Sequence, residues 1–250
     1  MATAAAVPPQ ETAPLSEIQR IVNTFVAPRK TFTDLRRSAA WWGPFLLMVV
    51  VSLVFVYVGD QKVGFRKIFE NQLQTQPKQA ERIESLPADQ REKVIQQQTT
   101  ITKVVSYIFP AITLIIWLVM AGVLYATVKF AASADVKFSA VFALLIYAAL
   151  PGLFKALLAI FSLLAGVSTD SFTFQNPVAT NPGYFIDPAG SSVLRAFLSS
   201  FDVFTIWTLV LVSIGLTCIA KVKSGTAYAI VFGWFAVTVL LGTGIAALFA

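Results

Sequence analysis

The sequence contains no histidine and only one cysteine among its 250 residues. Without histidine, neither a histidine general base nor a histidine metal ligand can exist, which excludes most familiar hydrolase and zinc mechanisms. The single thiol, Cys218, lies in an apolar run and has no partner for an intrachain disulfide or a thiolate cluster. The sequence also lacks a GxxxxGK[ST] phosphate loop, a GxGxxG motif and a GxSxG elbow. We therefore expect a non-enzymatic protein with no catalytic residue, no metal and no cofactor.

Charge is also scarce, because only 13% of the residues are charged while 56% are hydrophobic. Soluble domains carry roughly 25% charged residues, so this composition does not fit one. The apolar residues form long uninterrupted runs, which indicates a bilayer as the solvent. The net charge of +6 comes from basic residues dispersed around these runs, not from a dense basic tract. Membrane topology explains the positive charge more simply than a nucleic-acid partner does, and we expect none.

Five apolar runs are long enough to cross a hydrocarbon core about 30 Å thick as helices. They lack the two-residue alternation of barrel strands, and lipid cannot satisfy any other exposed backbone. The sequence therefore predicts an all-α polytopic membrane protein with a five-helix transmembrane bundle. The expected membrane domain covers residues 39–250, with spans at about 41–58, 105–128, 138–166, 203–220 and 228–249.

Residues 59–104, between the first two spans, form the one sizeable polar connection. They are rich in Gln, Glu, Lys and Arg with intermittent Ile, Leu and Val, which favours two or three helices. We expect a helical extramembrane loop whose last helix continues into the second span. The connection 167–202 contains two Asn-Pro pairs and one Asp-Pro pair, which predict turns.

The N-terminal region divides into a tail and an amphipathic segment. Residues 1–14 are small, polar and proline-containing, and we expect a disordered tail. In residues 15–38, apolar side chains recur at helical spacing beside five basic residues. This pattern predicts an interfacial helix with its apolar face in the headgroups and its cations on anionic lipid. The alternative is a short amphipathic helix that packs on the protein's own spans.

The distribution of Lys and Arg near the span ends predicts the orientation. The N-terminal segment, the connection 129–137 and the turn 221–225 carry most of the basic residues of the short connections. An odd number of spans places all three on one side, which gives a cytoplasmic N-terminus and an outer C-terminus. The connection 59–104 opposes this assignment with eight Lys or Arg residues, although six acidic residues nearly balance them.

Lys155 and Asp202 are the charged residues that the predicted spans have to accommodate. An ammonium in hydrocarbon costs a few kcal/mol or more, so it must find a partner, reach water or face the bundle interior. Asp202, at the start of the fourth span, lies at a compatible depth, and we hypothesise an intramembrane ion pair near the Pro151 kink. The alternative is that Lys155 extends to the interface while Asp202 only caps a helix.

Small residues in the fourth and fifth spans let helices approach closely, although no strict GxxxG motif is present. They are Gly215, Gly242, Gly244, Ala246 and Ala247. Packing within the bundle is one explanation for them, and a homo-oligomer interface is the other.

Three segments resemble the Yip domain family of Ypt/Rab-interacting membrane proteins, in its prokaryotic branch. The first, IVNTFVAPRKTFTDLRRSAAWWGPFLL, has the family's opening pattern and enters a span through Gly43 and Pro44. The second, FSAVFALLIYAALPGLF, has the Tyr147-to-Pro151 spacing of the third span. The third, SSFDVFTIWTLVLVSIGL, resembles the start of the fourth span and contains Asp202 and Trp207.

The resemblance implies a five-span bundle with a cytosolic N-terminus, and for eukaryotic members vesicle trafficking through Rab-type GTPases. The short tail and the long first loop depart from that picture and favour a prokaryotic relative in the bacterial inner membrane. We therefore expect a membrane scaffold or adaptor whose partners are lipids and other membrane proteins. The alternative is a small transporter or channel subunit that uses a kinked third span with Lys155 and Asp202.

Overall fold

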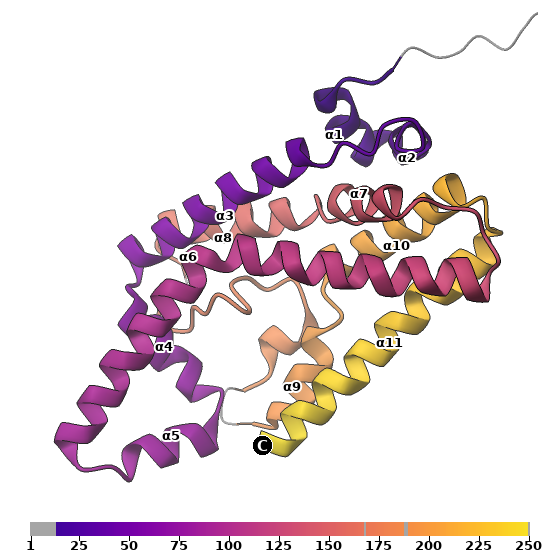
Figure 1. Ribbon diagram of the computed structural model, residues 1–250. Coiled ribbons are helices and arrows are strands. Elements are labelled where there is room, and N and C mark those ends of the chain that lie inside the picture. The colour runs from indigo at the N-terminus through magenta and orange to yellow at the C-terminus, as the bar shows by residue number, and fades with distance from the viewer. Residues whose placement is uncertain (1–13, 168, 188–189, 250) are drawn as a thin grey trace, which may run out of the picture.

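The computed structural model describes residues 14–167, 169–187 and 190–249, so nearly all of the predicted tail at 1–14 lies outside the described residues. Within these ranges every regular element is a helix, and helices of different lengths run along one elongated bundle (Figure 1). The elements are α1 (Glu17–Val26), α2 (Pro28–Asp34), α3 (Trp42–Lys62), α4 (Phe65–Gln74), α5 (Pro77–Glu84), α6 (Ala88–Ala126), the π-helix η1 (Thr127–Ala131), α7 (Phe138–Ala148), α8 (Gly152–Leu164), the 3₁₀ helix η2 (Pro182–Phe185), α9 (Ser192–Ser199), α10 (Val203–Ile219) and α11 (Ser224–Phe249).

The described residues contain four helices that are long and apolar enough to cross a membrane, or five if one bent pair is counted. Three of the four correspond to α3, to α6 with η1, and to α11. The other is the predicted third span, which forms α7 and α8 with a break at Ala149–Pro151. Proline cannot donate the backbone hydrogen bond that a continuous helix needs, which accounts for a break at this position.

The fourth predicted span, residues 203–220, is not a complete span on its own. It forms α10, whose 17 residues cover about 25 Å, less than the roughly 30 Å of a hydrocarbon core. Only together with α9, which precedes it across a bend of 44°, is α10 long and apolar enough to cross a membrane. The sequence analysis did not predict α9, because the residues before Ser192 are turn formers and indicated an irregular connection.

The core of the bundle is α7, in which every side chain from Ala140 to Ala148 is buried. It packs between α6 and α10, and α10 in turn packs against α11. Gly215 of α10 is part of this core, because a Cβ atom there would overlap the side chain of Leu144 in α7. The small residue therefore serves contact between two helices of the same chain at this position.

Replacing Gly215 with alanine is expected to lower the free energy of unfolding by about 1–3 kcal/mol, because overpacking a filled core forces neighbours to move. A matched control is Gly233→Ala in α11, where nothing lies within 4 Å of an added Cβ. The midpoints of thermal unfolding in detergent measure the difference. Equal midpoints for the two variants would show that Leu144 can rearrange without cost.

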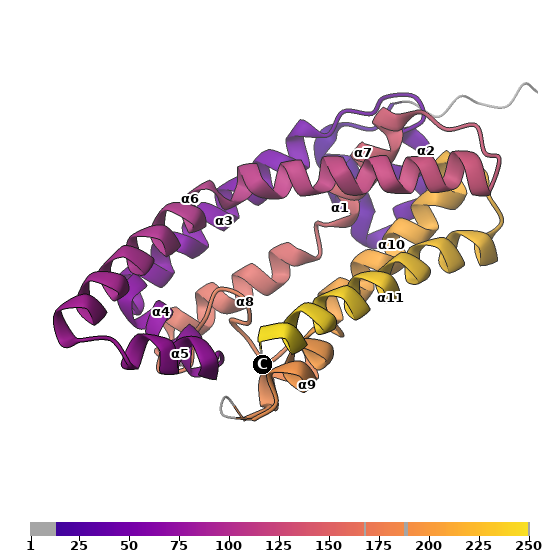
Figure 2. The same cartoon turned by 60° about the horizontal axis from the view of Figure 1, so that its bottom comes forward.

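The two connections predicted on the outer side meet at the end of the bundle opposite α1 and α2 (Figure 2). As expected, the connection 59–104 is helical and its last helix, α6, continues into the second span. Asn71 of α4 donates to the carbonyl oxygens of Thr169 at 3.2 Å and Phe172 at 3.0 Å. Phe172 is buried with Ile68 and Leu163, so this aromatic segment closes that end of the bundle.

Candidate functional site

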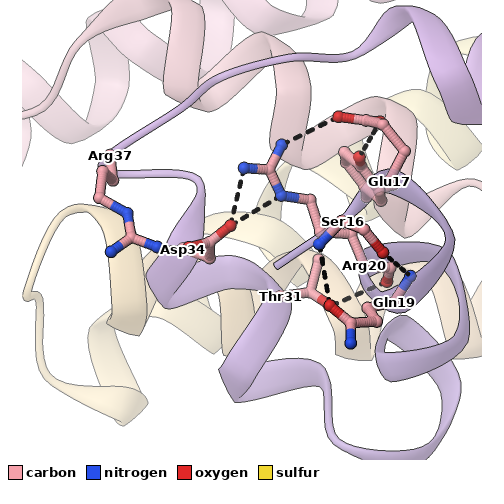
Figure 3. Close-up of polar contacts among 8 residues, drawn as sticks. Ser16, Glu17, Gln19, Arg20, Thr31, Asp34 and Arg37 are labelled. Atoms are coloured by element: carbon pink, nitrogen blue, oxygen red, sulfur yellow. Dashed lines mark hydrogen bonds and ion pairs between the residues drawn. The ribbon is translucent and has the colours of Figure 1, made fainter. Parts of the chain in front are cut away.

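The N-terminal helices α1 and α2 are joined to each other by a buried arginine. Arg20 of α1 has only 3% of its surface exposed, and its Nε donates to Oδ2 of Asp34 in α2 at 2.7 Å. A second nitrogen, Nη1, donates to Oε1 of Glu17 at 3.1 Å (Figure 3). Burial acts to lower the pKa of Arg20, but its hydrogen bonds and charge interactions with Asp34 and Tyr147 together outweigh this effect, so the pKa is raised above its ordinary value. The guanidinium is therefore a permanent cation inside the fold.

The backbone carbonyl of Arg20 takes part in the same junction. The hydroxyl groups of Thr24 in α1 and Thr31 in α2 both donate to it at 2.8 Å, and both threonines are fully buried. Ser16 and Gln19 form a capping box that fixes the start of α1. The two helices thus form a rigid hairpin, which we call the N-terminal hairpin (residues 16–34).

Glu17 connects this hairpin to the membrane bundle. Its Oε2 accepts a hydrogen bond of 2.8 Å from the hydroxyl of Tyr147, a fully buried residue of α7. Gly43, near the start of α3, lies so close that an added Cβ would be 2.7 Å from the same oxygen. Pro44 beside it is buried. Three residues of the sequence prediction, Gly43, Pro44 and Tyr147, therefore belong to the place where α1 docks.

The hairpin presents an unusual face to the bundle. The inward side of α1 carries the polar residues Arg20 and Thr24 together with Ile21 and Phe25, which pack against the core. Ile18, Val22 and Val26 point outward, with 74%, 51% and 74% of their surfaces exposed. We call these three residues the apolar stripe of α1. Sequence reasoning predicted an apolar face in the headgroups, with packing on the spans as the alternative, and it missed Glu17 and Asp34 as partners of Arg20. The one available signal was the i, i+3 pair of Glu17 and Arg20 on a single helix face.

Lys155 and Asp202, the other predicted pair, are in contact. The Nζ of Lys155 in α8 donates to Oδ2 of Asp202 at 2.9 Å, and the carboxylate is almost fully buried. Thr180 also donates its hydroxyl to Oδ2, a contact that sequence reasoning did not identify. Asp202 caps α10 as well, because its Oδ1 accepts from the backbone N–H of Phe204 at 2.9 Å. The ion pair and the cap, which the sequence analysis treated as alternatives, are thus present together.

Aromatic rings join the two clusters. Trp207 of α10 stacks on Phe154 of α8 with ring centroids 5.9 Å apart, and Phe25 of α1 packs edge-on against both rings. Pro151 lies between Tyr147 and this aromatic group, at the N-cap of α8. The predicted site residues are therefore brought into one continuous region, in which α1 contacts the broken third span.

A cavity of about 630 Å³ lies beside the ion pair, between α6, α8, α10 and α11. Its walls are mostly apolar, with Trp117, Val212 and Trp234 among them, and Lys155 and Asp202 line one part of it. The volume is within the range of about 300–1,000 Å³ for ligand pockets. Among the residues that the structure describes, no group of acidic or cysteine side chains is arranged to hold a metal ion.

A family model described as the Yip1 domain matches residues 22–246, which is nearly the whole chain. No curated protein and no solved structure matches the chain. The matched region includes Tyr147 and the cluster around Asp202, whereas residues 1–21, with Glu17 and Arg20, and the C-terminal end lie outside it.

Proposed function

Since this chain belongs to the Yip1 domain family of integral membrane proteins, we propose that it is a non-enzymatic scaffold or adaptor that binds membrane lipids and other membrane proteins. The proposal places it in a bacterial inner membrane, with the N-terminus in the cytoplasm and the C-terminus outside. The placement is supported by the basic residues of the N-terminal segment and of the two short connections near it.

The observation that carries the proposal is the orientation of α1. Ile21 and Phe25 pack on the bundle and Glu17 is bound to Tyr147, yet α1 keeps the apolar stripe exposed, which a helix in water would avoid. An outward apolar stripe at the end of a membrane bundle suits the boundary between headgroups and acyl chains. In this proposal α1 is the amphipathic interfacial helix expected from the sequence, and its inward face, with Glu17, Ile21 and Phe25, anchors it to the protein.

The opposite end offers a surface for protein partners. The helices α4, α5 and the first turns of α6 extend from the bundle and carry exposed charges, with Arg66 bound to Glu92 at 2.6 Å and to Glu70 at 3.0 Å. Ion pairs that are this exposed to water contribute little to the stability of the fold. We therefore interpret this end as a solvated surface that a protein partner can reach, and not as part of a packed core.

Photoreactive groups at Val22 and at Lys78 in native membranes test the proposal. We expect Val22 to give mainly lipid adducts and Lys78 to give a discrete protein adduct that mass spectrometry identifies. Thr24, which is fully buried, is the matched control and should give only adducts within the chain. If neither Val22 nor Lys78 gave an adduct with lipid or with another protein, the scaffold role would be contradicted.

The alternative function, a small transporter or channel subunit, is favoured by the cavity of about 630 Å³ beside Lys155 and Asp202. Broken helices and intramembrane charges line the pathways of many transporters. Against this function, the carboxylate of Asp202 is already bound by Lys155, Thr180 and the N-terminus of α10. The charges therefore have a structural use that requires no transported solute.

A further inference from the structure

A second, larger cavity of about 1,500 Å³ opens at the end of the bundle that carries the N-terminal hairpin. Three segments that are distant in the sequence line it: residues 29–37, residues 131–137 and residues 219–226. These are the basic stretch of the N-terminal segment and the two short connections that the charge distribution assigns to one side. The cavity is larger than ordinary small-ligand pockets of about 300–1,000 Å³.

The lining of this cavity is strongly basic. Seven cations contribute to it, against two acidic residues, Asp34 and Asp135. Asp34 is already bound to Arg20 and Arg37, at 2.7 Å and 2.8 Å. Within the described part of the chain, six of the cations are exposed and form no ion pair: Arg29, Lys30, Arg36, Lys137, Lys221 and Lys223. Unpaired like charges around one concavity repel one another, and a polyanion would relieve this repulsion.

The turns that line the cavity also contain strained backbone. Ser133 and Lys221 are the non-glycine residues with positive φ in the described chain, at 49° and 54°, and both belong to the lining. Glycine adopts this conformation at no steric cost, whereas other residues pay for it in strain. At position 221 the sequence has a lysine, which supplies a charge to the cavity that glycine would not.

The cavity lies at the ends of membrane-spanning helices, which is where lipid headgroups are expected. Its walls are the ends of spans, namely the C-terminal end of η1, the N-terminal end of α7, the C-terminal end of α10 and the first turn of α11. Phe130 and Phe138 beside it are apolar and exposed, with 80% and 38% of their surfaces accessible. A membrane lipid could place its acyl chains along these rings while its headgroup entered the basic cavity.

We propose that this cavity binds the headgroup of a phospholipid that carries two phosphates. The inference rests on the proposed scaffold function and adds a specific lipid site to it. The cations come from three separate segments around a cavity of about 1,500 Å³, so two linked phosphates can engage more of them than one phosphate can. Bidentate arginine contacts and lysine point charges are the groups that recognise phosphate.

The full-length protein in detergent micelles is titrated with cardiolipin, which carries two phosphates, and bound lipid is counted by native mass spectrometry. We expect cardiolipin to bind at least about tenfold more tightly than phosphatidylglycerol, which carries one phosphate. The triple variant Lys137→Gln, Lys221→Gln and Lys223→Gln should weaken cardiolipin binding on the order of 100-fold, about fivefold per cation lost.

The matched control is Lys62→Gln, Lys78→Gln and Lys93→Gln, which removes three exposed lysines outside the cavity lining and changes the net charge equally. It should change cardiolipin binding less than about threefold. Equal losses in both triples would overturn the site in favour of a general charge effect. Inorganic pyrophosphate that binds as tightly as cardiolipin would overturn the lipid source, and polyglutamate that does so would point to an acidic protein instead.

A single substitution separates binding from folding. Lys221→Gly removes one cation and relieves the positive-φ strain, so binding should fall about fivefold while the midpoint of thermal unfolding holds or rises. Unchanged binding in this variant would contradict the proposal. The cardiolipin titration and the crosslinking at Lys78 are independent measurements. Absence of cardiolipin binding would reject the lipid site alone, and absence of a protein adduct at Lys78 would reject the adaptor role alone.

Discussion

Replacing Arg20 with methionine is expected to lower the free energy of unfolding by about 3–5 kcal/mol, because it leaves the partly buried Glu17 without its cation and the buried carboxylate of Asp34 with only the exposed Arg37. Methionine preserves the length and the aliphatic packing of the side chain, so the loss measures mainly the charge. Arg20→Lys should be intermediate, since one ammonium cannot reproduce the fork of donors toward two carboxylates. Thermal unfolding in detergent, followed by tryptophan fluorescence, gives the midpoints.

Arg29→Met in α2 is the matched control, because Arg29 is exposed and forms no ion pair in the described chain. Its midpoint should stay within the range of surface substitutions, about ±0.5 kcal/mol. If Arg20→Met were equally mild, the N-terminal hairpin would be only loosely attached to the bundle. Protease accessibility at residues 27–38 would then be high in the unaltered protein too, which provides an independent check.

The sequence predicted the spans well because length and apolar composition alone determine whether a helix can cross a bilayer. The broken third span was predictable too, since Pro151 cannot continue the helix. The bend before α10 was not predictable. The turn-forming residues that precede Ser192 indicated an irregular connection, whereas an eight-residue helix begins at Ser192. Short helices of this kind depend on tertiary packing, and α9 obtains it from α11.

The candidate site was predictable only in part. Gly43 and Tyr147 were identified by resemblance, but their common partner, Glu17, was not. Hydrophobic periodicity cannot reveal such a contact, because it locates apolar side chains and does not say which carboxylate meets which tyrosine. The structure divides the apolar residues of α1 between two sides, with Ile21 and Phe25 packed on the core and the apolar stripe exposed.

Removing Lys155 is expected to be as costly as removing Arg20. In Lys155→Met the carboxylate of Asp202 stays buried, with 3% of its side chain exposed, but loses its counter-ion, which should cost about 3–5 kcal/mol. The double variant Lys155→Met, Asp202→Asn should recover most of this loss. Asparagine carries no charge, yet its carbonyl oxygen can still accept from Phe204 and cap α10.

The charge swap Lys155→Asp, Asp202→Lys tests the same pair and should restore stability less completely than the neutral double variant. A lysine at position 202 has no acceptor for the backbone N–H of Phe204, so the cap of α10 is lost at a cost of about 1 kcal/mol. Thermal unfolding of the neutral and the swapped double variants, each with its own two single variants, gives two double-mutant cycles. If neither double variant were more stable than Lys155→Met, the contact between the two residues would contribute nothing.

The neutral double variant also separates the scaffold from the transporter. Because it is expected to fold, any loss of ion or solute flux in proteoliposomes would come from the missing charges and not from unfolding. A scaffold predicts no flux in either the unaltered protein or the double variant, with lipid and protein adducts unchanged in both. Flux that is present in the unaltered protein and absent in the double variant would make Lys155 and Asp202 part of a transport pathway, and the cavity of about 630 Å³ beside them its binding site.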